Sequence, residues 1–101
     1  MSNEMSKHTP GPWFVTGNMT LYIEARIGGG LIQEVAAVGP TEADSGYGPQ
    51  QRANADLLAA APVLLAELEE THAALCFTPD YIGTERHKRN SAAIAKARGE
   101  A

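Results

Sequence analysis

The stretch MTLYIEARIGGGLIQEVAAV, residues 19–38, decides the first half of the fold. Apolar and polar side chains alternate through residues 19–27, which is typical of a half-buried β-strand. One side carries Met19, Leu21, Ile23, Ala25 and Ile27, and the other carries Thr20, Tyr22, Glu24 and Arg26. Three glycines at residues 28–30 can take positive φ without steric cost, so they predict a turn into a second strand over residues 31–38.

The segment before this stretch predicts a third strand. Residues 8–13 read HTPGPW, and the two prolines with a glycine between them favour an ordered turn or extended lead-in that delivers Trp13 to the fold. A short strand follows, and Gly17-Asn18 is a turn dipeptide that closes a hairpin. We therefore expect a flexible lead-in over residues 1–11 and a three-stranded antiparallel β-meander over residues 12–38.

The second half of the chain reads as helical from about Gln50 to Arg98, after a loop over residues 39–49. An arc of roughly 120° holds the apolar side chains of the first helix, the width of a core-facing stripe. These residues are Leu57, Leu58, Ala61, Leu64, Leu65, Leu68, His72 and Leu75. Pro62 predicts either a kink or two helices that meet near Ala61. Thr84 is a candidate N-cap for a last helix, with Gly99 at its C-terminal end.

These elements predict an α+β fold, in which a small antiparallel sheet precedes a C-terminal αα-hairpin, within one domain over residues 1–101. A domain of 101 residues builds only a modest core, so we expect a homodimer or larger assembly to bury the surplus Leu and Ala. The single cysteine forms no internal disulfide, and the first ten residues are too polar for a signal peptide. No apolar run approaches the roughly 20 residues that cross a bilayer. We therefore expect a cytoplasmic protein with no membrane contact.

A metal site is one interpretation of His72 and Cys76, which lie four residues apart on one helix face. A third ligand would have to be His87 or an acid such as Asp80, and no familiar zinc spacing supports it. The alternative is that His72 is packed or lies at an oligomer interface and that Cys76 is a small buried hydrophobic residue. We favour this alternative and predict no metal and no cofactor. No nucleophile elbow, phosphate loop or carboxylate pair is present, so we also predict no enzyme.

The last helix is basic, with five of the eight Lys and Arg residues of the chain. They are Arg86, Lys88, Arg89, Lys96 and Arg98, and His87 lies among them. A nucleic-acid patch is one interpretation. The net charge of −4 opposes it, as do Glu67, Glu69 and Glu70 on the preceding helix, which an antiparallel helix pair brings near these cations. We therefore favour a structural role for the basic residues.

The junction between the loop and the first helix offers a candidate ligand site, in residues 45–54, SGYGPQQRAN. A helix N-terminus presents unpaired amides to an anion, and Arg52 can add a bidentate contact to a phosphate. Tyr47 can stack on a base, while Asn54 and, on the polar strand face, Arg26 complete the predicted ligand-binding set. Against this reading, Glu42 and Asp44 oppose an anion, and a mobile loop with a solvated Arg52 explains the same residues.

Three blocks of the sequence resemble a widespread group of short phage and prophage proteins: HTPGPW at residues 8–13, ANADLLAAAPVLL at 53–65 and AIAKA at 93–97. The resemblance implies a phage context and assigns no activity. More distantly, the chain is similar to the phage anti-Thoeris sponge proteins. That similarity implies a sheet with C-terminal helices, oligomerisation, and sequestration of cyclic ADP-ribose signals without cleavage. None of that family's ligand-contacting residues is carried over to this chain.

We therefore expect a phage-encoded, non-enzymatic binding protein. The leading hypothesis is an anti-defence sponge that sequesters a cyclic nucleotide or cyclic ADP-ribose immune signal. The alternative is a protein-interaction module that blocks or adapts a host protein through the acidic loop or the basic last helix. A third hypothesis is a weak nucleic-acid binder that uses Arg86, Lys88 and Arg89.

Overall fold

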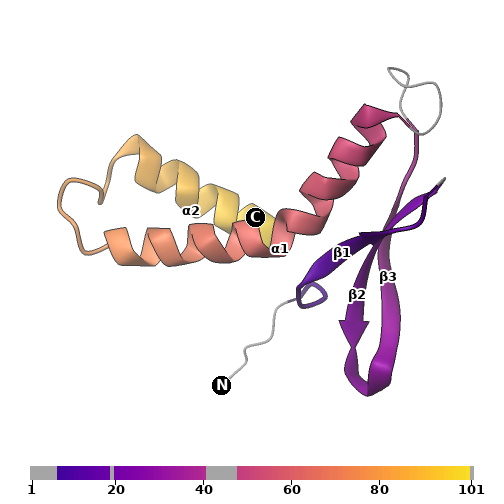
Figure 1. Ribbon diagram of the computed structural model, residues 1–101. Helices are drawn as coiled ribbons and strands as arrows, with labels where there is room; N and C mark the ends of the chain where they lie inside the picture. The colour runs from indigo at the N-terminus through magenta and orange to yellow at the C-terminus, as the bar shows by residue number, and fades with distance from the viewer. Residues whose placement is uncertain (1–6, 19, 41–47, 101) are drawn as a thin grey trace. The chain divides into compact units, whose positions relative to one another are not determined.

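A three-stranded antiparallel sheet is followed by two helices, as Figure 1 shows. This computed structural model describes residues 7–18, 20–40 and 48–100. The elements are β1 (Trp13–Thr16), β2 (Leu21–Ile27), the 3₁₀ turn η1 (Gly28–Gly30), β3 (Leu31–Val38), α1 (Pro49–Leu75) and α2 (Glu85–Ala97). The predicted α+β fold class is confirmed. Within the described segments, neither helix has the length and apolar character needed to cross a membrane.

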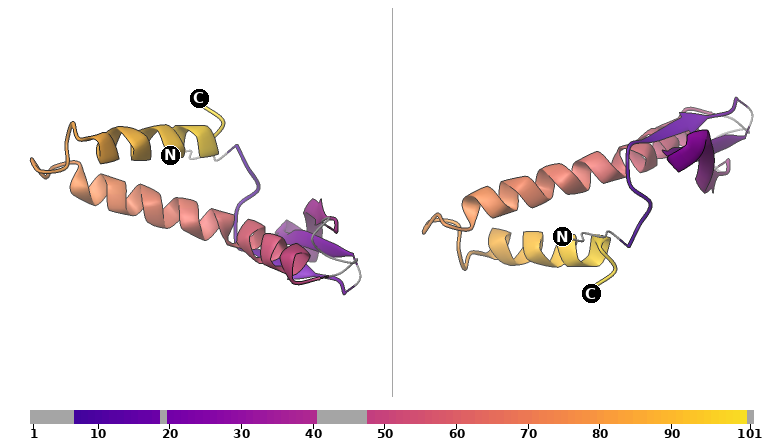
Figure 2. Two further views of the ribbon diagram at one scale, coloured as in Figure 1. Left: turned by 90° about the horizontal axis from the view of Figure 1, so that it is seen from above. Right: turned by 90° about the horizontal axis from the view of Figure 1, so that it is seen from below.

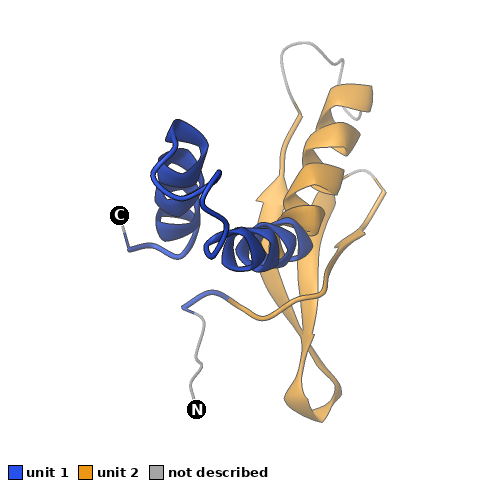
Figure 3. Cartoon of the chain, turned by 90° about the vertical axis from the view of Figure 1, so that its left-hand side faces the viewer, with its two compact units in different colours: residues 1–8, 63–101 blue, residues 9–62 orange. Residues whose placement is uncertain are grey.

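The chain divides into two compact units, which Figure 3 colours separately. The sheet unit is Thr9–Pro62, and the hairpin unit is Met1–His8 together with Val63–Ala101. Helix α1 contributes to both units, since it runs unbroken from Pro49 to Leu75 with Pro62 inside it. Of the two predicted outcomes at Pro62, two separate helices are therefore not observed. The prediction of one domain over residues 1–101 stays a prediction.

The sheet follows the alternation of the sequence. β2 pairs with both neighbours, and η1 joins β2 to β3, with positive φ at Gly29 and Gly30. The β2–β3 register shifts between Ile23, opposite Ala36, and Glu24, opposite Glu34, so that Val35 is the extra residue of a β-bulge. Val35 and Ala36 both pack against the core, although they are consecutive in the strand.

The first part of α1 covers one face of the sheet. Its Ala55 is fully buried against Leu21, Ile23 and Val38, with Trp13 and Val15 of β1 packed around them. Gln51, one turn before Ala55, is also buried, and its Nε2 donates to the carbonyl oxygen of Val38 at 2.7 Å. Since a β-strand end leaves backbone carbonyls to be satisfied, this bond joins the helix start to the end of β3.

The predicted inward side of β2 is confirmed at its centre and differs at its ends. Leu21, Ile23 and Ala25 are buried, whereas Ile27 is 39% exposed because it lies at η1, beyond the reach of α1. Met19, the first residue of the predicted alternation, lies outside the described residues.

Near the start of the sheet unit, Gly11 lies so close to Pro62 that a Cβ on Gly11 would lie 2.8 Å from the proline Cβ.

The hairpin unit contains the second part of α1 and the whole of α2, which run side by side in Figures 1 and 2. Thr84 caps α2 as predicted, because its Oγ1 accepts from the amide of His87 at 3.1 Å. Gly99 ends the helix with a φ of 76°. The amides of Gly99 and Glu100 donate to the carbonyls of Lys96 and Ala95, which forms a Schellman motif.

Candidate functional site

A polar cluster joins the two helices of the hairpin unit, and His72 of α1 is at its centre. Its Nδ1 lies 2.6 Å from the Tyr81 hydroxyl, and its Nε2 lies 3.1 Å from Oγ of Ser91 on α2. Tyr81 is buried in the loop between the helices, and its hydroxyl oxygen accepts from Nδ2 of Asn90 at 3.0 Å. Three elements of the unit thus meet at one imidazole ring.

One assignment of the protons satisfies all three hydrogen bonds of the cluster. The Tyr81 oxygen accepts from Nδ2 of Asn90, and we assign the Tyr81 proton to the bond with Nδ1 of His72. Nε2 then carries the imidazole proton and donates to Ser91. In this tautomer the imidazole takes no proton from Ser91, unlike the base beside a catalytic serine. The cluster is arranged to hold the helices together.

His87 packs against the same cluster from the first turn of α2. Its ring stacks on that of His72, with centroids 5.2 Å apart, and meets the edge of Tyr81 at the same centroid distance. Its Nδ1 accepts from the Gly83 amide at 3.3 Å. One face of α2 therefore packs against α1 and the loop.

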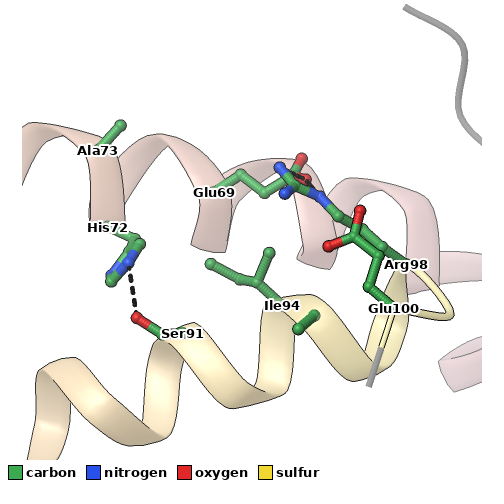
Figure 4. Close-up of a pocket in the computed structure, with 8 residues that line it drawn as sticks. Glu69, His72, Ala73, Ser91, Ile94, Arg98 and Glu100 are labelled. Carbon is green, nitrogen blue, oxygen red and sulfur yellow. Dashed lines mark hydrogen bonds and ion pairs between the residues drawn. The ribbon is translucent and has the colours of Figure 1, made fainter.

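A pocket of about 320 Å³ lies beside the cluster, as Figure 4 shows. Ile94 is the buried apolar residue of the lining, and His72 and Ser91 supply polar groups on one side. On the other side, Nη2 and Nε of Arg98 lie 2.6 and 2.8 Å from one carboxylate oxygen of Glu69. Because its cation is neutralised by Glu69, this pocket is poorly suited to a phosphate, although it can hold a small neutral group.

The predicted ligand residues of α1 point in different directions. Arg52 forms an ion pair with Asp56 one turn later, with Nε 3.3 Å from Oδ1, and both side chains are largely exposed. Asn54 is also exposed. Residues two apart on a helix lie roughly 200° apart around its axis, so these two side chains do not converge.

The two remaining predicted residues lie elsewhere. Arg26 is on the face of β2 opposite that of Leu21, with its guanidinium carbon 5.5 Å from the centroid of the Phe14 ring. It is five residues, or about 17 Å, along the strand from Leu21, which pairs with Val38 beside the start of α1. Tyr47 lies outside the described residues. One copy of the sheet unit therefore does not gather Arg26, Arg52 and Asn54, and their predicted role in ligand binding stays a prediction.

The residues considered for a metal make other bonds. Sγ of Cys76 donates to the carbonyl oxygen of Ala73 at 3.0 Å, and both nitrogens of His72 are bonded as described above. Within residues 7–18, 20–40 and 48–100, no group of three or more His, Cys, Asp or Glu side chains is arranged to hold a metal ion. The geometry favours the alternative reading of His72 as a packed residue.

Sequence reasoning identified His72 but missed its partners Tyr81 and Ser91, as well as Asn90, which donates to Tyr81. One signal was available, because a histidine on an apolar helix stripe needs hydrogen-bond partners when it is covered. Tyr81 and Ser91 are nine and nineteen residues from His72, so local sequence patterns did not identify them.

Comparison with known proteins places the chain in a phage protein family. A protein-family model described as Salmonella phage P22 protein Y8K6 matches residues 1–101. The matched range includes both the sheet unit and the hairpin unit. No curated protein and no solved structure matches the chain.

Proposed function

The chain belongs to the family of Salmonella phage P22 protein Y8K6, and from this premise we propose that it is a binding protein that acts in the host cytoplasm and catalyses no reaction. We further propose that it works as a homo-oligomer that blocks or adapts a host protein. The supporting observation is the set of large hydrophobic side chains that are exposed in the described part of the chain.

Exposed apolar side chains outnumber buried ones in the described part of the chain. Ten large hydrophobic residues are exposed, whereas seven hydrophobic residues are buried and two of these are alanines. The exposed set is Ile27, Leu31, Ile32, Leu57, Leu58, Val63, Leu64, Leu75, Phe77 and Ile82. Monomeric soluble proteins rarely expose large contiguous apolar patches, so the exposed neighbours Leu31 and Ile32, Leu57 and Leu58, and Val63 and Leu64 favour contact with other protein surfaces.

Light scattering during gel filtration tests the assembly, with the full chain compared with a Leu57→Gln, Leu58→Gln double variant. These side chains are 65% and 42% exposed, so their replacement removes apolar surface with little cost to the fold. We expect an oligomer for the wild type and smaller species for the variant. Ala53→Gln, at an exposed position on the same helix, is the control. A wild-type monomer at every soluble concentration would contradict the proposed assembly.

A pull-down tests the host partner. Wild-type protein should retain one host protein, the Leu57→Gln, Leu58→Gln variant should lose it, and Arg52→Gln should leave retention unchanged. If retention follows Arg52 and not the leucines, recognition uses the start of α1 in place of the apolar surface.

Sequestration of a cyclic nucleotide or cyclic ADP-ribose immune signal is a second candidate function, as an anti-defence sponge. The observation that favours it is the start of α1, whose first turn contains no acidic residue and ends at the exposed Arg52. A helix N-terminus with this charge pattern suits an anion. Because Arg26, Arg52 and Asn54 do not converge in one copy, such a pocket needs residues from more than one copy.

Mass spectrometry of released small molecules tests the sponge directly. Purified protein is incubated with a panel of cyclic nucleotides and cyclic ADP-ribose isomers, desalted and heated. We expect the wild type to release one compound and Arg52→Gln to release much less. Lys88→Gln, which also removes an exposed cation with an ion pair inside its own helix, is the matched control. The absence of any retained compound would remove this candidate and leave the protein-binding role standing.

A further inference from the structure

The two helices of the hairpin unit carry opposite charges on the sides turned away from each other. The contact between His72 and Ser91 defines the inward side of each helix. Glu70 and Glu67 precede His72 by two and five residues. At about 100° per residue, both positions lie roughly 140° to 160° around α1 from His72. These two residues, the acidic pair, therefore lie on the outward side of α1.

Helix α2 repeats this spacing with the opposite sign. Arg89 and Arg86 precede Ser91 by the same two and five residues, so these two residues, the basic pair, lie on the outward side of α2. Figure 2 shows the two helices side by side, with α2 and the second part of α1 each open on its far side within the unit.

The four side chains are exposed and make no ion pair with any residue in the described ranges. Two other cations of this region, by contrast, make ion pairs. Arg98 pairs with Glu69 across the helices, and Lys88 lies 3.6 Å from Glu85 within α2. The structural role predicted for the basic helix therefore applies to Arg98, whereas the basic pair can contact another surface.

We propose that the acidic pair on α1 of one copy docks against the basic pair on α2 of another copy. This inference rests on the proposed homo-oligomer and adds a charged contact to the apolar one tested by the Leu57→Gln, Leu58→Gln variant. The members of each pair are three residues apart, or about 4.5 Å along the helix axis, so the two pairs match in spacing as well as in sign. The net charge of −4 opposes a nucleic acid as the occupant, and the matching spacing of the two pairs favours a second copy.

Small and apolar residues beside the charged pairs allow α1 of one copy to approach α2 of another. Ala92 and Ala93 follow Arg89 on the exposed side of α2, and Val63, which is 56% exposed, precedes Glu67 by one turn on α1. Helices with such residues at the contact pack at the usual 8–10 Å or slightly closer. Because the two pairs are on opposite sides of the hairpin unit, the contact is heterologous and joins copies head to tail in a ring or an open array.

A charge exchange tests this contact in the full chain. One variant carries Arg86→Glu and Arg89→Glu, and the other carries Glu67→Arg and Glu70→Arg. Each variant alone places like charges at the contact, so we expect its self-association to weaken by more than about tenfold. In an equimolar mixture of the two variants, every contact between unlike copies pairs opposite charges, and the four substitutions in one chain restore opposite charges at every contact. Both should therefore assemble again.

Sedimentation velocity at low and high salt measures the assembly, and circular dichroism checks that each variant keeps its helices. Glu34→Arg, an exposed position on β3, is the control for a charge reversal outside the contact. A wild-type oligomer that neither variant weakens, or a mixture that does not assemble, overturns this inference and leaves the proposed homo-oligomer intact. A wild-type monomer overturns both. If the basic pair is needed to bind duplex DNA and not for assembly, the occupant is nucleic acid and the inference is wrong.

Discussion

The sheet unit and the hairpin unit are stabilised in different ways, although α1 contributes to both. The sheet unit closes around Leu21, Ile23, Val38 and Ala55, which are all buried. Among its described residues, the hairpin unit buries only Tyr81 and Ile94, and it relies on hydrogen bonds between its helices and their loop. Apolar burial is non-directional, whereas hydrogen bonds require one arrangement of their partners. The difference indicates that packing stabilises the sheet unit and that the polar cluster selects the register of the hairpin.

This contrast explains where the chain has surface available for binding. A helix pair with few buried apolar residues leaves Leu64 and Leu75 on its surface, together with Phe77 in the loop, which is 87% exposed. In the sheet unit, exposed apolar residues gather around η1, at Ile27, Leu31 and Ile32. Both units therefore contribute to the uncovered surface on which the proposed assembly rests.

The largest effect on stability is expected from Ile23→Ala in the sheet unit. Ile23 is fully buried at the centre of β2, so we expect a loss of about 3 to 4 kcal/mol in the free energy of unfolding of this unit. Trp13 is the only tryptophan of the chain and packs against this core, so its fluorescence during urea unfolding reports the change.

Ile32→Ala is the matched control for that measurement, because Ile32 is in the same sheet but exposed. We expect its free energy of unfolding to fall by less than about 0.5 kcal/mol. Equal losses for Ile23 and Ile32 would mean that the described core does not stabilise the sheet unit, and the contrast between the units would fail.

An intermediate effect is expected from Tyr81→Phe in the hairpin unit. The change removes the hydroxyl that bonds His72 and Asn90 and leaves polar groups of both residues without this partner. We expect a loss of about 1 to 2 kcal/mol, seen as faster amide hydrogen exchange in α2 and the preceding loop.

Tyr22→Phe serves as the control, since this half-buried tyrosine of β2 makes no hydroxyl bond with the described residues. It should leave hydrogen exchange in the hairpin unit unchanged. If Tyr81→Phe is equally neutral, the cluster is a consequence of helix packing and does not stabilise the hairpin.

Local sequence signals predicted the elements better than the contacts between them. Period-two alternation identified β2, and the Thr84 cap and Gly99 identified the ends of α2, because each signal depends on residues close in sequence. The bulge at Val35 depends on how β3 pairs with β2, and the alternation of one strand does not contain that information.

The candidate site illustrates the same limit. Arg52 and Asn54 were grouped because they are close in sequence, yet a helix turns them to different sides. That separation follows from the helical period, so sequence reasoning had the means to find it. The partners of His72 required knowledge of how α2 aligns with α1, which is determined by tertiary packing.

The smallest effect on stability is expected at the end of the hairpin unit, from loss of the ion pair of Arg98. Arg98→Gln removes the ion pair with Glu69, in which both side chains are partly exposed, at 47% and 31%. Solvent screens such a pair, so we expect a loss of about 0.5 kcal/mol at low salt and less in concentrated salt. Lys96→Gln removes a charge at the same helix end, where it acts on the helix dipole in the same way, and its side chain makes no ion pair in the described part of the chain. The difference between the two variants in urea unfolding, followed by helix circular dichroism, therefore isolates the pair. A difference that does not fall as salt rises would show that Arg98 stabilises the hairpin by packing of its alkyl chain and not by its charge.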